Sequence, residues 1–77
     1  MDNYLEELWQ KTLRLIRNEI TDVSFDTWIK VIEPVSIKGD QLYLCVPNDF
    51  TKSILEGRYT SLISNAVKQV SSRSYYI

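Results

Sequence analysis

Apolar side chains recur every three or four positions through the first quarter of the chain. Within about half of a helical wheel fall Leu5, Leu8, Trp9, Leu13, Leu15, Ile16 and Ile20. This pattern predicts an amphipathic helix from Asp2 or Asn3 to Glu19. Acidic residues crowd its start and basic residues follow, as the helix dipole favours.

A second, shorter helix is predicted where Ser24 follows an interruption at Thr21-Asp22-Val23. Serine is a favourable N-cap residue, so we expect Ser24 to begin this helix. Its apolar residues are Phe25, Trp28, Ile29 and Ile32. Pro34 cannot continue a helix and pushes Glu33 out of helical geometry, so the helix should end there.

The next segment alternates apolar and polar residues and predicts a β-hairpin. Val35 and Ile37 alternate with polar neighbours, and Lys38-Gly39-Asp40 forms the turn, whose type the sequence leaves open. In the second strand Leu42, Leu44 and Val46 share one face, and Tyr43 and Cys45 share the other. We expect Cys45 to pack as a small hydrophobe.

Pro47 ends the strand, and Asn48 is the predicted N-cap of the next helix. The apolar residues of this helix are Phe50, Ile54 and Leu55, followed beyond Gly57 by Tyr59, Leu62, Ile63, Ala66, Val67 and Val70. Gly57 should interrupt or bend it. Ser71-Ser72-Arg73-Ser74 is loop-like, and Tyr75-Tyr76-Ile77 is predicted as a final strand.

The predicted order is helix, helix, strand, strand, helix with a possible break, and strand. This order indicates an α+β sandwich in which helices cover one face of a small three-stranded sheet. The 77 residues should form a single domain, 1–77.

The composition of the chain argues against catalysis, metal binding and phosphate binding by this domain. The chain has no histidine, one cysteine and two glycines, so the commonest general base, a cysteine-rich zinc site and a phosphate-binding glycine loop are all missing. We therefore expect no enzyme activity, no cofactor and no metal. The net charge of −1 provides no excess of positive charge with which to bind nucleic acid. Without a membrane span or a signal peptide, and with a lone thiol, a cytoplasmic location is expected.

A chain of this length has one small core, so some large aromatic rings should stay partly uncovered. Trp28 is a candidate because Phe25 and Ile29 already provide inward contacts for the short second helix. Phe50 is a candidate because it lies in the first turn of its helix, near the helix end. Uncovered rings of this kind would make a docking surface for another protein.

Five runs of residues, in order and over nearly the whole chain, resemble one family. They are Leu8-Trp9-Gln10, Ser24-Phe25-Asp26-Thr27-Trp28-Ile29, Leu42-Tyr43-Leu44, Val46-Pro47-Asn48-Asp49-Phe50 and Arg58-Tyr59. Together they resemble the N-terminal domain of the DnaA family of bacterial replication initiators. The resemblance implies a K-homology-like fold and a role in protein contact. The implied partners are the replicative helicase, regulators of initiation and other copies of the initiator, with weak single-stranded DNA binding as well.

The resemblance also implies that the ATPase and duplex-DNA-binding domains lie outside this chain, which would be an excised domain. A single-stranded nucleic-acid binder of the K-homology class is the alternative function. That class clamps the backbone with a Gly-x-x-Gly loop, which this sequence lacks.

Six residues carry the implied contacts. Trp28 and Phe50 match the partner-binding aromatics, and the alternatives are a core position for Trp28 and a helix-end staple for Phe50. Ser24 stands where some relatives carry an acidic residue, so one helicase contact is in question and N-capping is a sufficient role.

Three further positions also stay open. Thr27 is either a rim beside Trp28 or plain solvated surface, and Asn48 is either a regulator contact or only an N-cap. Trp9 matches the self-association residue of the family, yet it falls near the middle of the apolar arc of the first helix, which favours the core.

Overall fold

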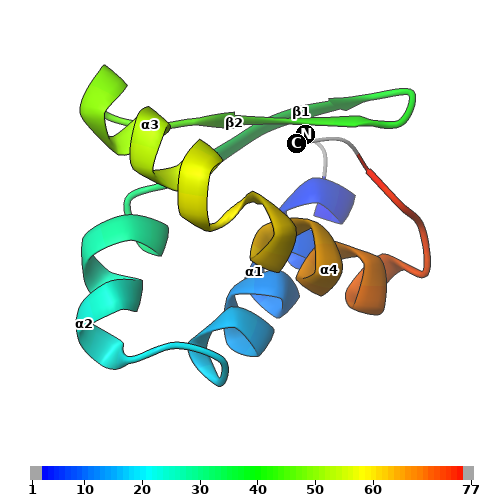
Figure 1. Ribbon diagram of the computed structural model, residues 1–77. Helices are drawn as coiled ribbons and strands as arrows, with labels where there is room; N and C mark the ends of the chain where they lie inside the picture. Colours follow the sequence, from blue (N-terminus) through cyan, green and yellow to red (C-terminus); the bar gives the residue numbers. More distant parts are fainter. Residues whose placement is uncertain (1–2, 76–77) are drawn as a thin grey trace.

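The computed structural model describes residues 3–75 and shows short helices packed against a β-hairpin (Figure 1). In chain order the elements are α1 (Asn3–Arg17), α2 (Asp22–Ser24), the π-helix η1 (Phe25–Ile29), β1 (Glu33–Lys38), β2 (Gln41–Cys45), α3 (Asp49–Arg58) and α4 (Thr60–Ser71). The predicted α+β class is confirmed. Figure 1 shows α1 and α4 side by side beneath the hairpin, and α1 contacts both β1 and α4.

The apolar arc of α1 forms the centre of the core. Leu5, Leu8, Trp9 and Ile16 are buried, and Thr12 is buried among them. The Thr12 hydroxyl donates a hydrogen bond to the Leu8 carbonyl at 2.8 Å, so this polar group costs little in the apolar interior. The helix ends at Arg17, two residues before the predicted Glu19.

The second helix begins earlier than predicted, and Ser24 is not its N-cap. Thr21 has an extended backbone, and its hydroxyl accepts a hydrogen bond from the Ser24 amide at 3.1 Å. Ser24 itself has helical dihedral angles, which exclude the N-cap role. The chain then widens into η1, where the Lys30 amide donates to the Phe25 carbonyl at 2.9 Å.

The hairpin has the predicted faces on β2 but not on β1. Leu42 is buried, whereas Tyr43 and Cys45 are exposed, so the expectation that Cys45 packs is wrong. A register shift between Pro34 and Ser36 turns Val35 out to 58% exposure, although Ile37 is half-buried. Gly39 has a φ of 62° and Asp40 does not enter the positive-φ region, which is the pattern of a type II′ turn.

The predicted helix break is present, but it lies at Tyr59 rather than at Gly57. Tyr59 leaves helical geometry with a φ of −121° and a ψ of −2° and buries its ring in the core. The Thr60 hydroxyl donates to the carbonyls of Leu55 and Glu56, which lie at the end of α3. Burial of Tyr59, together with this capping, therefore explains the break better than the flexibility of glycine.

The sheet of the described residues has two antiparallel strands, β1 and β2. Of the predicted final strand, Tyr75 is buried in irregular backbone, and Tyr76 and Ile77 lie outside the described residues. The predicted loop at 71–74 begins one residue later, because α4 continues to Ser71. The C-cap residue Ser72 has a left-handed backbone conformation. A third strand and a K-homology-like arrangement stay predictions.

Candidate protein-contact site

Trp28 of η1 and Phe50 of α3 form an exposed aromatic contact. Their ring centroids lie 6.0 Å apart with a 50° angle between the ring planes. This separation falls within the range of favourable tilted aromatic pairs. Trp28 is half-buried and packs against the core, whereas 67% of Phe50 is exposed. We call Trp28 and Phe50 the aromatic pair.

The first turn of α3 determines where the Phe50 ring points. Asn48 has an extended backbone, and its side-chain oxygen accepts a hydrogen bond from the Thr51 amide at 2.8 Å. Thr51 is buried, whereas Phe50, about 100° away around the helix, is 67% exposed and faces outward. The predicted N-cap role of Asn48 is confirmed. Phe50 contacts Trp28 across the gap between two helices and is not stapled inside the core.

Replacing Asn48 with alanine should lower the free energy of unfolding by about 1 kcal/mol, because the Thr51 amide loses its cap. Thermal melting followed by circular dichroism should show a drop of roughly 4–8 °C. Asn48→Ser keeps a capping oxygen and should recover most of the loss. An unchanged melting temperature for Asn48→Ala would contradict a stabilising cap.

Ser24 and Thr27 precede Trp28 on the same helical segment, and both hydroxyls bond locally. The Thr27 hydroxyl donates to the Val23 carbonyl at 2.7 Å, and Ser24 Oγ accepts from the Thr21 hydroxyl at 3.0 Å. Thr27 is exposed and Ser24 is half-buried. The structure therefore leaves Thr27 at the surface, next to Trp28 in the chain, and gives Ser24 a role inside the turn.

Trp9 lies in the core and is only 2% exposed. Of the two interpretations left open by the sequence, burial is the one observed. The buried ring has almost no surface to offer a second copy of the chain, so contact between copies would need other residues.

A shallow hollow at the end of β2 is a feature that the sequence did not reveal. It is lined by Val31, Glu33, Cys45, Val46 and Pro47. Val31 is 39% exposed and comes shortly after η1 in the chain, and Pro47 precedes the cap of α3, so the lining comes from the chain just after one ring-bearing segment and just before the other. One sequence signal pointed to this exposed position: Val31 does not lie on the apolar helix face formed by Phe25, Ile29 and Ile32.

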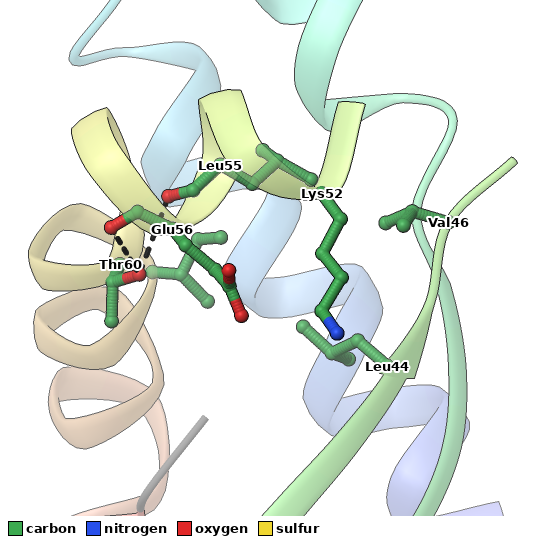
Figure 2. A pocket seen from close by; sticks show the side chains of 7 residues that line it. Leu44, Val46, Lys52, Leu55, Glu56 and Thr60 are labelled. Atoms are coloured by element: carbon green, nitrogen blue, oxygen red, sulfur yellow. Dashed lines mark hydrogen bonds between the residues drawn. The ribbon is translucent and has the colours of Figure 1, made fainter. Parts of the chain in front are cut away.

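A second hollow separates β2 from α3 and the start of α4 (Figure 2). Leu44, Val46, Leu55 and Ile63 supply its apolar lining, with Lys52, Glu56 and Thr60 as the polar groups. Figure 2 shows the Thr60 hydroxyl engaged with two carbonyls of α3 and the Lys52 side chain extended toward Leu44. Because the Thr60 hydroxyl is already engaged and only Lys52 and Glu56 remain as polar groups, this hollow is a weaker candidate than the aromatic pair.

Within residues 3–75, no three acidic, cysteine or histidine side chains converge as metal ligands would. None of the helices in that part of the chain is both long and apolar enough to cross a membrane.

The fold and the site define a small α+β domain that presents a pair of aromatic rings from two neighbouring helices. The chain belongs to the DnaA N-terminal domain family, because the sequence model of that family matches residues 6–69 of its 77 residues. Membership of this family gives the chain a role in the initiation of DNA replication.

Proposed function

We propose that this domain is a docking module of a replication initiator and that the aromatic pair is its main contact. Its partners would be the replicative helicase, proteins that regulate initiation and, more weakly, other copies of the initiator. The domain would act in the cytoplasm through binding rather than through catalysis. The observation that carries the proposal is the 67% exposure of Phe50 beside the half-buried Trp28.

A large exposed ring that rests against a second, anchored ring has the properties of an interface hot spot. Trp28 is held by the core, so covering it costs little conformational entropy. Phe50 offers most of its surface to a partner. Aromatic anchors of this kind often contribute about 2 kcal/mol or more to binding.

The surroundings of the pair support a small, specific contact. Thr27 would supply a polar rim, and exposed Asn48 stands at the base of Phe50 while it caps α3. Val31 and Pro47 add apolar surface at the hollow at the end of β2. Ser24 would act by shaping the turn that precedes Trp28.

A contact of this size is weak by itself, and assembly would make it effective. Several initiators gathered on one origin would present several copies of the pair to a multisubunit helicase. Tethering of this kind raises avidity by factors of roughly 10² to 10⁴ without any new contact. Regulators could then compete with the helicase for a single weak surface.

Replacing Phe50 with alanine tests the proposal directly. Binding of the 77-residue chain to the helicase of the same organism should weaken roughly thirtyfold, as expected for the loss of a hot-spot ring. The free energy of unfolding should change by no more than about 1 kcal/mol, because the ring is largely exposed. Biolayer interferometry and thermal melting measure the two quantities.

Tyr43→Ala is the matched control, because Tyr43 is an exposed ring, at 44%, on the opposite face of the hairpin from the core. This variant should bind the helicase as the parent chain does. Equal affinity of Phe50→Ala and the parent chain would refute the assignment of the surface, and an equal loss in both variants would show a non-specific effect.

A further inference from the structure

A hollow between α1 and η1 gathers positive charge. It is lined by Gln10, Leu13, Arg14, Arg17, Phe25 and Lys30 and is called the basic hollow below. The lining contains three cationic side chains and no carboxylate, although the whole chain has a net charge of −1. One third of its nine basic residues therefore lies around one depression of the surface.

The negative ends of nearby helices compensate only part of this positive charge. Arg17 ends α1 and Lys30 follows the last residue of η1, so the negative ends of two helices meet at the basic hollow. Each end carries at most about half an elementary charge, and a short helix carries less. Three cations exceed that charge and leave a net positive site.

The fold holds one of these cations in position. The Arg17 guanidinium carbon lies 4.5 Å from the centroid of the Phe25 ring. Phe25 is only 4% exposed, so the guanidinium stacks on a fixed surface while its side chain remains exposed. Stacking leaves the in-plane N–H donors free to bind a planar anion in bidentate fashion. Arg14 lies one turn earlier on the same face of α1.

We propose that the basic hollow binds an acidic segment of a partner protein. Carboxylates of that segment would pair with Arg14, Arg17 and Lys30, and one of its apolar side chains would rest on Leu13. This contact goes beyond the docking role of the aromatic pair and shares no residue with it.

The site favours an acidic peptide over a nucleic-acid strand. Proteins that bind single strands stack bases on exposed aromatic rings within a basic groove. Phe25 is the aromatic ring in this lining, and it is buried beneath Arg17. Partly buried Leu13 instead offers a contact for an aliphatic side chain.

The probe for the test is a synthetic peptide of about a dozen residues in which glutamates alternate with leucines, long enough for two or three turns of helix or an extended stretch. Titrated into the isotope-labelled 77-residue chain at low salt, it should shift the amide resonances of Arg14, Arg17 and Lys30 in a saturable way. Arg14→Glu/Lys30→Glu should weaken this binding by about tenfold or more, because charge reversal replaces attraction with repulsion.

Lys52→Glu/Lys68→Glu is the matched control, since both lysines are exposed on α3 and α4 and the change in net charge is the same. The control should bind the peptide as the parent chain does. Equal losses in the two variants, or shifts spread evenly over the surface, would overturn the proposal. So would tighter binding of an oligothymidylate of equal charge at the same amides, because that result would assign the hollow to nucleic acid.

The outcome is separable from the test of the aromatic pair. Phe50→Ala should leave peptide binding at the basic hollow unchanged, and Arg14→Glu/Lys30→Glu should leave the ring contact between Trp28 and Phe50 in place. A peptide affinity that falls with Phe50→Ala instead would contradict a separate site.

Discussion

Replacing Trp9 with alanine should unfold the domain at room temperature. The indole is 2% exposed and lies on the helix that contacts both α4 and the hairpin, so its removal leaves a large cavity at the centre of the core. Truncation of a buried tryptophan typically costs about 3–5 kcal/mol. A domain of this size rarely has more than about 3–5 kcal/mol of stability, so little would remain.

Far-ultraviolet circular dichroism and urea titration measure this effect. Trp9→Ala should lose the cooperative transition, and Trp9→Phe should keep it with a lower midpoint, because phenylalanine fills part of the cavity. Phe50→Ala provides a control that removes a large ring from the surface. A Trp9→Ala variant that melts cooperatively within a few degrees of the parent chain would contradict the central position of this residue.

The two rings of the aromatic pair should contribute jointly to partner binding. Trp28→Ala and Phe50→Ala should each weaken helicase binding roughly thirtyfold, since each removes a hot-spot ring. The double variant should lose less than the product of the two factors. The rings lie 6.0 Å apart, so each single change also removes the support that one ring gives the other.

A double-mutant cycle measures this coupling, which we expect at about 0.5–1.5 kcal/mol for an aromatic pair. Trp28→Ala should also lower the melting temperature, because Trp28 is half-buried, whereas Phe50→Ala should hardly change it. Val35→Ala, at an exposed apolar residue of β1, serves as the control. Strictly additive losses would show that the two rings bind the partner independently.

The local signals of the sequence predicted most elements of the fold. The apolar period of α1, the alternation along β2 and the Asn48 cap depend on neighbours in the chain, and all three are confirmed. The predicted start of the second helix was wrong, because Ser24 and Thr21 are both good capping residues. A backbone angle, and not residue type, decides between them.

The environment of each aromatic ring was harder to predict. Trp9 and Trp28 both fall on apolar helix faces. Helical position favoured the core for Trp9 and partial exposure for Trp28, but it left the alternative open for each ring, and only packing decides between them. The break at Tyr59 depends on the burial of its ring, a contact with distant parts of the chain. The basic hollow was missed for the same reason, because Lys30 joins Arg14 and Arg17 only when η1 packs beside α1.

The sequence by itself determined the α+β class, the positions of most helices and strands, the family, and Trp28 and Phe50 as candidate contact residues. These properties follow from short-range periodicity, capping and residue type. Only the tertiary structure decided that Trp9 is buried, that Phe50 is exposed against Trp28, and that three cations meet between α1 and η1. Burial and proximity depend on how separate elements pack together, and no local pattern specifies that packing.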